Sequence, residues 1–212
     1  MTQFERFFAV IKKPWMILSY ALLVVLVYQF LDKPIAIYFH HLDYRSYAHI
    51  LHLLTTVGKW KIYFILFILL GLFFRFVKKN VVYEQRAWFL LACVVLPNLV
   101  GLVLKITVSR SRPDLLFDGD FFGFYWFKFN DLFWSFPSGH SITVAGLAAG
   151  LGALFPRYFY VFLGLALLVT STRVFLYFHY LSDVMIGFYI SMLVVGFFTE
   201  SLKKNHCLAE IT

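Results

Sequence analysis

The amino-acid sequence predicts an all-α integral membrane protein, a bundle of six transmembrane helices that forms a single domain over residues 1–212. Composition is the first observation behind this prediction: 61% of the residues are hydrophobic and 14% are charged, a mixture that would expose a large apolar surface in water. The second is that the apolar residues gather in stretches close to the roughly 20 residues that cross a bilayer as a helix. A chain of 212 residues is also the size of one domain.

Six apolar segments account for the predicted spans. Helices are expected because a backbone exposed to lipid must satisfy its own hydrogen bonds, and Lys and Arg at the segment ends extend to the headgroups. The segments lie at 14–31, 60–77, 87–106, 138–156, 158–178 and 184–201. Basic residues precede the first segment and no small-residue cleavage site follows it, so we expect an uncleaved span there rather than a signal peptide.

Two of the segments carry residues with a structural meaning. Pro97 and Asn98 interrupt the third segment and predict a kink. The fourth segment is rich in Gly and Ala, with Gly146 and Gly150 four residues apart, a spacing that lets helix backbones approach closely. We therefore expect the fourth helix at the centre of the bundle.

The basic residues indicate a membrane rather than a nucleic acid as the partner. The net charge is +8, but Lys and Arg stand mainly at the ends of apolar runs, which is the membrane pattern. Six spans place both termini on one side, and the Lys and Arg next to the termini predict that this side is cytoplasmic, although the first outer connection also holds four basic residues. The compact chain and its short tail favour a bacterial inner membrane.

With that topology the connections 107–137 and 178–183 emerge on the same side, opposite the termini. The first of them is aromatic. Its aromatic residues are Phe121, Phe122, Phe124, Tyr125, Trp126, Phe127, Phe129, Phe133, Trp134 and Phe136. Such a run is typical of an aromatic belt at the interface, and it also suits an amphipathic segment that guides a lipid tail toward a polar site. The two interpretations are compatible.

Unusual polar residues gather on the same side. Lys105 and Arg112 flank the exit of the third segment, and the sequence Pro137-Ser138-Gly139-His140 opens the fourth. Ser suits a helix cap and Pro an early helical position, and the free N–H groups of a helix start bind anions. Taken alone, each cation is more often a membrane anchor, and the Ser could be only a helix cap.

The exit of the fifth segment adds Arg173, His179 and Asp183. The spacing of four between His179 and Asp183 places them on one helical face, or next to each other across a helix end. Asp183 would then hold one ring nitrogen while the other faces a substrate, although such a pair is often structural. Arg173 falls within an apolar helix, and an ionisable group in a membrane is by default a functional candidate.

Together these groups fit a tetrahedral phosphate better than a metal ion. Arg and Lys match phosphate oxygens, and phosphoryl transfer depends mostly on positioning and electrostatics. No metal and no cofactor is expected, because the acidic residues of the 107–137 connection are scattered and the remaining histidines lack companion ligands. These residues are Asp114, Asp118, Asp120, Asp131, His40, His41, His49 and His52. Cys93 and Cys207 are too isolated for a disulfide or a metal site.

Three ordered motifs resemble those of the type 2 phosphatidic acid phosphatase superfamily, which includes bacterial lipid phosphatases, glucose-6-phosphatase and the soluble vanadium haloperoxidases. The motifs define a core at 105–183 of an acid phosphatase-like domain. They read Lys105-x6-Arg112-Pro113, Pro137-Ser138-Gly139-His140 and Arg173-x5-His179-x3-Asp183. One departure is Thr172, where the family often has Ser; the hydroxyl is kept.

The resemblance implies a role for each motif residue. His179 attacks phosphorus to form a phosphohistidine and Asp183 orients its ring. His140 protonates the leaving oxygen and then activates water, as microscopic reversibility requires. The remaining residues hold the phosphate oxygens, and these are Lys105, Arg112, Ser138, Gly139 and Arg173.

The sequence thus predicts a membrane lipid phosphatase with its site near the outer, periplasmic boundary. Its candidate substrates are undecaprenyl diphosphate, phosphatidylglycerophosphate, phosphatidic acid and lipid A phosphate. Two alternatives stay open: a phosphotransferase that passes the phosphoryl group to another lipid, and a transporter or channel whose cations bind an anion. The sequence leaves the lipid and the oligomeric state undetermined.

Overall fold

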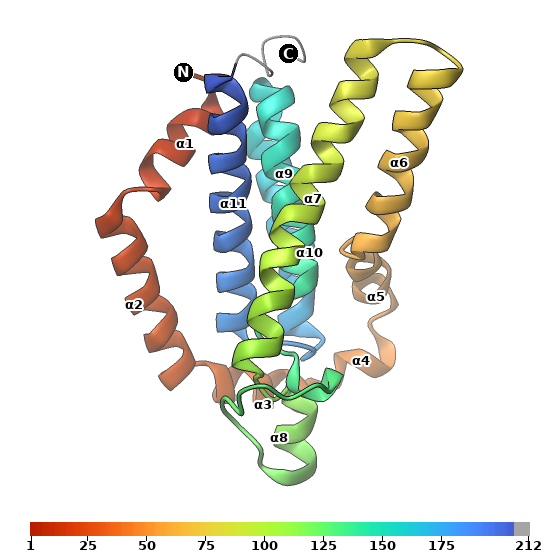
Figure 1. The fold of residues 1–212 in the computed structure, drawn as a ribbon. Coiled ribbons are helices and arrows are strands. Elements are labelled where there is room, and N and C mark those ends of the chain that lie inside the picture. The colour runs from red at the N-terminus through yellow and green to blue at the C-terminus, as the bar shows by residue number, and fades with distance from the viewer. Residues whose placement is uncertain (206–212) are drawn as a thin grey trace.

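The computed structural model describes residues 1–205, and in this part of the chain every regular element is a helix (Figure 1). The α-helices are α1 (Gln3–Ile11), α2 (Pro14–Phe30), α3 (Asp32–Leu42), α4 (Tyr44–Tyr47), α5 (His49–Thr56), α6 (Trp60–Phe76), α7 (Val81–Val108), α8 (Pro113–Gly119), α9 (Gly139–Leu154), α10 (Phe159–Phe175) and α11 (Leu181–Lys204). Two short 3₁₀ turns, η1 (Asp131–Phe133) and η2 (Pro156–Tyr158), complete the set. The all-α prediction is confirmed.

The six predicted segments correspond to α2, α6, α7, α9, α10 and α11. By length and composition, three helices are able to cross a membrane: α7, α11 and the stretch Pro156–Phe175 that contains α10. The number rises to five if the bent pairs α1–α2 (72°) and α5–α6 (42°) each form one span. At 16 residues, α9 is apolar but shorter than a full span. The chain is therefore a multi-pass membrane protein, and the count of six spans stays a prediction.

Helix α9 lies at the centre of the bundle, as the sequence predicts. It packs against α7, α10 and α11 (Figure 1), and most of its residues are buried. The two spaced glycines face α7: a Cβ at Gly146 would lie 2.4 Å from the Cys93 carbonyl oxygen, and one at Gly150 would lie 2.9 Å from the Cys93 sulfur. Only glycine permits this approach of the two helices.

Pro97 lies inside α7, which continues through it without a break. Because proline has no N–H, the carbonyl of Cys93 four residues earlier loses its helical donor. That carbonyl is the group against which Gly146 packs. Asn98 links the two helices further, since its Nδ2 donates to the Val94 carbonyl at 2.8 Å and to Thr143 Oγ1 at 3.1 Å.

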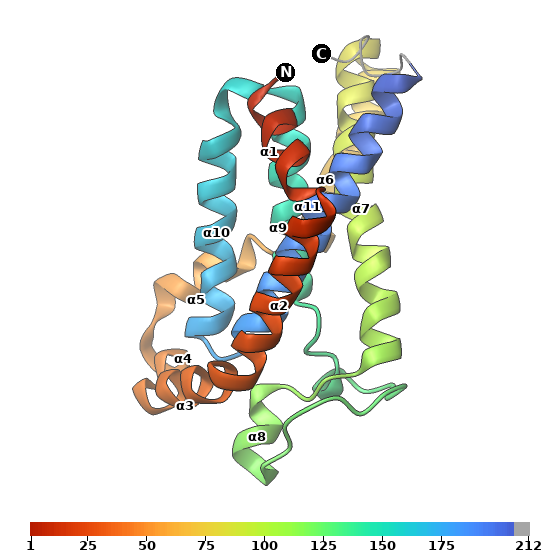
Figure 2. The same ribbon diagram turned by 90° about the vertical axis from the view of Figure 1, so that its left-hand side faces the viewer.

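The connection 32–59, which separates the first two predicted segments and contains His40, His41, His49 and His52, is folded into α3, α4 and α5. These helices have 4 to 11 residues, too short and too polar to stand out as apolar segments. Helix α1, with 9 residues, is likewise too short to appear among the predicted segments. Figure 2 shows α1 and α2 as two differently inclined helices along the outside of α11.

Cys93 is buried in α7, whereas Cys207 lies outside the described residues.

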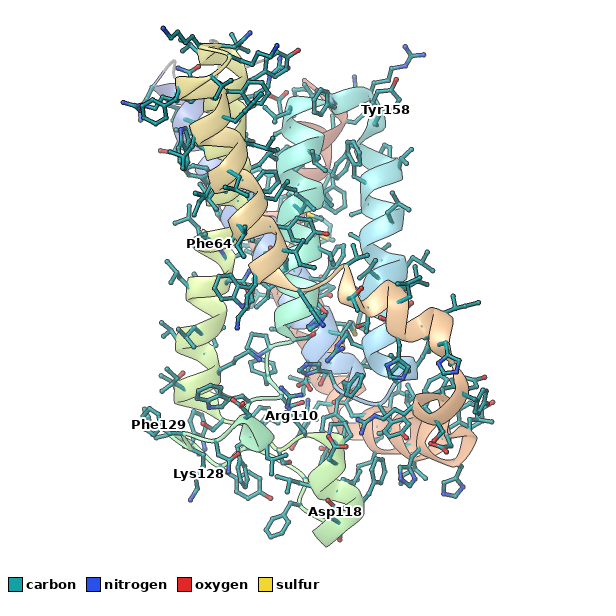
Figure 3. All side chains as sticks on the ribbon, turned by 90° about the vertical axis from the view of Figure 1, so that its right-hand side faces the viewer. Phe64, Arg110, Asp118, Lys128, Phe129 and Tyr158 are labelled. Atoms are coloured by element: carbon teal, nitrogen blue, oxygen red, sulfur yellow. The ribbon has the colours of Figure 1, made fainter. Side chains whose placement is uncertain are left out.

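The bundle has two distinct ends. The start of α1 and the end of α11 lie at one end, and α3, α4 and α8 lie at the other (Figure 1). The connection 107–137 covers that second end and includes α8 and η1. Several of its aromatic side chains are exposed, among them Trp126, Phe127 and Phe129, and Figure 3 shows Phe129 and Lys128 at its outer edge. Which membrane side each end faces, and whether the exposed aromatic residues contact lipid, stay predictions.

The close approach of α9 to α7 predicts a difference between two glycine substitutions. Gly146→Ala places a methyl group 2.4 Å from a backbone oxygen, so it should destabilise the protein by about 1–3 kcal/mol. Gly164→Ala is the matched control, because no atom lies within 4 Å of its Cβ position in α10, and alanine favours the helix. Thermal unfolding in detergent should show a lower midpoint for the first variant alone. An unchanged midpoint for Gly146→Ala would disprove the tight contact.

Candidate active site

The start of α9 is the first part of the candidate site. Ser138 is its N-cap and is fully buried, and its Oγ accepts from the Ser141 N–H at 3.5 Å. Gly139 and His140 are the first residues of the helix, so their N–H groups have no partner within it. A Cβ at Gly139 would lie 3.9 Å from the Lys105 side chain. The start of α9 therefore lies directly beside the Lys105 side chain.

Lys105 joins the last turn of α7 to the segment that leads into α9. Its Nζ donates to the Trp134 carbonyl at 2.8 Å and to the Pro137 carbonyl at 2.6 Å. An ammonium group has three hydrogens, so one remains for a ligand. The backbone of 134–137 thus fixes the cation beside the α9 start.

Two arginines approach from other elements. Arg112, the N-cap of α8, donates from Nε to the Asp131 carbonyl at 2.9 Å. Arg173 is in the last turn of α10, where its Nη1 donates to Thr55 Oγ1 at 2.9 Å and its guanidinium lies 4.4 Å from the centre of the Phe178 ring. Arg173 is only 6% exposed, and its buried Nε has no hydrogen-bond partner in the described part of the chain.

His179 lies in the short connection between α10 and α11 and is buried. Its Nδ1 is 2.8 Å from the carbonyl oxygen of Ser135. A carbonyl only accepts hydrogen bonds, so the geometry assigns the ring hydrogen to Nδ1 and leaves the lone pair on Nε2. Burial lowers the pKa of His179 well below its usual value, and the positive charges of Arg112, Arg173 and Lys105 lower it further. The ring is therefore neutral and has a free acceptor nitrogen, as a nucleophile requires.

Asp183 supports this arrangement through Ser135. Its Oδ2 accepts from the Ser135 hydroxyl at 2.6 Å and from the Tyr180 N–H at 3.0 Å, and its Oδ1 accepts from Arg110 Nη1 at 2.6 Å. The distance from Oδ2 to His179 Nδ1 is 3.9 Å. The sequence predicts that Asp183 holds the ring nitrogen itself. In the structure the Ser135 carbonyl accepts that hydrogen bond, and the carboxylate is a close charged neighbour of the ring.

His140 contributes a second imidazole. It is half-buried in the first turn of α9, directly after the residue that packs beside Lys105. A Cβ at Gly58 would lie 2.6 Å from the His140 ring. Gly58 follows α5, so the end of the 32–58 segment packs directly against this histidine.

The structure brings the sequence-predicted residues together at one end of the bundle. It also adds residues that no motif marked, namely Asp32, Arg45, Thr55, Arg110 and Ser135. Arg110 lies between Lys105 and Arg112 in the sequence. An ionisable residue at a membrane boundary, close to an aromatic run, could have marked it as a candidate. Figure 3 shows Arg110 inside the lower end of the bundle. Among residues 1–205, no three His, Cys, Asp or Glu side chains form a group able to hold a metal ion.

Comparison with known proteins identifies similar chains. The family model described as the PAP2 superfamily matches residues 86–207. The chain is 41% identical over 99 residues to two proteins named lipid A 1-phosphatase, from Rhizobium etli and Rhizobium johnstonii. That alignment covers 47% of this chain and 43% and 41% of the two relatives, so the chain spans less than half the length of the curated relatives it matches.

A solved structure shares the fold. It is the transmembrane PAP2 type phosphatidylglycerolphosphate phosphatase of Bacillus subtilis, with a TM-score of 0.60 at 19% sequence identity. The alignment covers 89% of this chain and 94% of that one.

The geometry around His179 predicts an unusual titration. An imidazole with the ordinary pKa of 6.5 is half protonated at that pH, but His179 should remain neutral there and take up a proton only at lower pH. Proteins labelled with ¹⁵N in their histidine rings report both the charge and the tautomer by NMR, and a spectrum of His179→Gln identifies the signal. We expect a neutral ring with hydrogen on Nδ1 at pH 6.5. Half protonation at that pH would refute this description of the site.

Proposed function

The chain belongs to the PAP2 superfamily, and on that basis we propose that it is a membrane lipid phosphatase that acts through a phosphohistidine intermediate without a metal ion. The observation that carries the proposal is the buried Nε of Arg173, which has no partner among residues 1–205. A buried donor without an acceptor is costly. A phosphate oxygen would satisfy it, next to a neutral histidine.

Charge balance supports an anionic substrate. Lys105, Arg112 and Arg173 all act on His179 electrostatically, so three cations surround one ring. Asp183 is the nearby carboxylate, but its oxygens are already bound by Arg110, Ser135 and the Tyr180 backbone. The site therefore holds an excess of positive charge, which a phosphate group would neutralise.

The proposed first step is attack by His179 Nε2 on phosphorus. A bond forms between Nε2 and phosphorus while the bond from phosphorus to the leaving oxygen breaks. His140 gives a proton to that oxygen from its imidazolium form, which the negative charge of the bound phosphate favours. The His179 ring becomes positively charged because Nδ1 keeps its hydrogen. Asp183, 3.9 Å from Nδ1, stabilises that charge.

In the second step water attacks the phosphohistidine. His140, now without its proton, removes one from the water as the oxygen bonds to phosphorus and the bond to Nε2 breaks. Inorganic phosphate leaves and His179 is neutral again. Through both steps the phosphate oxygens are held by Lys105, Arg112, Arg173, Ser138 and the Gly139 N–H, which face the charge that develops in the transition state.

An apolar groove favours a lipid as the substrate. A cavity of about 450 Å³ lies between α6, α7 and α9 and reaches Lys105 and Gly139. Its walls include Trp60, Phe64 and Leu102, which are exposed on the outside of the bundle. An apolar groove that ends at a cationic site accommodates a phosphate with an attached acyl or isoprenoid chain.

The two curated relatives favour lipid A phosphate among the four candidate lipids, because they are named lipid A 1-phosphatase and are 41% identical to this chain over 99 residues. We further propose that the single membrane-embedded domain covers residues 1–212 with its motif core at 105–183. The protein then lies in the bacterial inner membrane with cytoplasmic termini and with the site facing the periplasm.

The proposed mechanism predicts the effect of removing each histidine. His179→Ala and His140→Ala should each lower phosphate release at least about a thousandfold, since they lack the nucleophile and the proton donor. His49→Ala is the matched control, because His49 is exposed in α5, and it should keep full activity. Phosphate release in detergent from each of the four lipids measures all three variants, with lipid A phosphate expected to be the best substrate.

Three outcomes of that assay contradict the proposal. Full activity of either folded site variant refutes the assigned roles. Phosphate release that depends on an added acceptor lipid indicates a phosphotransferase. No release from any lipid, combined with anion transport that survives His179→Ala, indicates a transporter.

A chelator should have little effect. The proposed cations are side chains of the protein, so incubation with EDTA is expected to leave the initial rate of phosphate release within about twofold of the untreated rate. The assay is run with and without added Mg²⁺. Complete inhibition that Mg²⁺ reverses would show that the reaction depends on a divalent ion.

A further inference from the structure

Arg110 lies at the centre of a buried ion network behind His179. Its Nη1 donates to Asp183 Oδ1 at 2.6 Å and to Ser182 Oγ at 2.7 Å, and its Nη2 donates to Asp32 Oδ2 at 2.8 Å. Ser182 also binds Asp32, through its N–H to Oδ1 at 3.0 Å and through its hydroxyl to Oδ2. One arginine thus joins two carboxylates from α3 and α11.

The network is sealed from solvent. The side chains of Arg110, Asp32 and Asp183 are all 0% exposed. Four aromatic rings surround the guanidinium of Arg110, with their centres 4.2 to 5.5 Å from its central carbon. The rings belong to Tyr28, Phe122, Phe124 and Tyr180. Charges in such surroundings interact strongly because little water screens them.

With Arg110 charged and both carboxylates ionised, the charges of Asp32, Arg110 and Asp183 sum to −1. Although burial lowers the pKa of Arg110, the two carboxylates raise it overall, so the guanidinium stays charged. Burial raises the pKa of Asp32, but its oxygens accept hydrogen bonds from Arg110 Nη2, the Ser182 N–H and the Ser182 hydroxyl. Three donors directed at one carboxylate favour its ionised form.

We propose that Arg110 and Asp32 are positioning residues for the reaction at His179: Arg110 fixes the Asp183 carboxylate beside the ring, and Asp32 offsets the charge of Arg110. Without Asp32, the positive charge of Arg110 would cancel that of Asp183. Asp183 would then no longer stabilise the cation that forms on His179 during attack. This inference rests on the proposed role of His179 as the nucleophile.

Asp32 is far in sequence from the motif residues that it would help to position. Asp32 lies outside the region 86–207 that matches the family model, and it is 150 residues from Ser182 in sequence. A purely structural ion network would act on stability alone. A positioning role must also appear in the rate per folded active site.

The experiment compares Asp32→Asn, Arg110→Gln, the double variant and Arg110→Lys. For each, kcat and KM are measured with the best lipid, and active sites are counted from the amount of folded protein that elutes as one peak from a size-exclusion column. We expect each single neutral variant to lower kcat per active site by about tenfold, with KM changed less than twofold. The double variant restores a net charge of −1 and should lose no more than the worse single variant. Arg110→Lys keeps the charge and should recover part of the rate.

The matched control is Glu84→Gln. Glu84 forms an ion pair with Arg75 at 3.2 Å, and these residues lie in the first turn of α7 and the last turn of α6. This change should leave kcat per active site unaltered.

The inference fails if wild-type protein releases phosphate and the single variants keep its kcat per active site, even if they unfold at a lower temperature. It also fails if the double variant shows the product of the two single losses, because the charges would then act independently. If wild-type protein releases no phosphate from any lipid, the proposed function itself is wrong. The two failures are therefore distinguishable.

Discussion

Asp183 is the residue on which the arrangement of the site depends, because it binds the segments that follow α7, precede α9 and precede α11. Its carboxylate accepts from Arg110 after α7, from Ser135 before α9 and from the backbone of Tyr180. Its own carbonyl accepts the Ser138 N–H at 3.1 Å. A single buried carboxylate thus fixes the distance between the start of α9, which faces the anion, and the connection that carries His179. Since each of these partners is buried, loss of the Asp183 carboxylate would take a hydrogen bond from Arg110, Ser135 and the Tyr180 N–H in a medium where that is costly.

Two other parts of the bundle hold the residues around Asp183 in place. Small residues in α9 allow α7 to pack at the distance of backbone contact, which brings Lys105 to the Gly139 turn. The segment 32–58 covers the site from the other side. Its Arg45 donates to the Leu176 and Tyr177 carbonyls at 2.6 Å and pairs with Asp114 of α8, so it holds the connection before His179 in place. Thr55 binds Arg173. The N-terminal part of the chain, which precedes the matched family region, therefore helps to build the site.

Much of this arrangement could be predicted from the sequence, and the part that could not has a common cause. Apolar segments mark α6, α7 and α11 because lipid imposes a minimum length. The three motifs mark residues such as His140, Arg173 and His179 because the members of each motif lie close together in sequence. The helices α3 to α5 are too short for that signal. Asp32, Ser135 and Arg110 act through contacts between elements, which spacing within a motif cannot encode. The hydrogen bond of His179 Nδ1 shows the difference: its sequence spacing points to Asp183, whereas the fold supplies the Ser135 carbonyl at 2.8 Å.

The central claim is that Nε2 of His179 becomes bonded to phosphorus. The most direct measurement is to quench the enzyme in alkali during turnover of a lipid labelled in its phosphate, digest it and locate the label by mass spectrometry. The account predicts a phosphoryl group on His179 that is stable to alkali and released by acid, and none in His179→Ala. Label on another residue, or turnover with no labelled protein at any time, would contradict it.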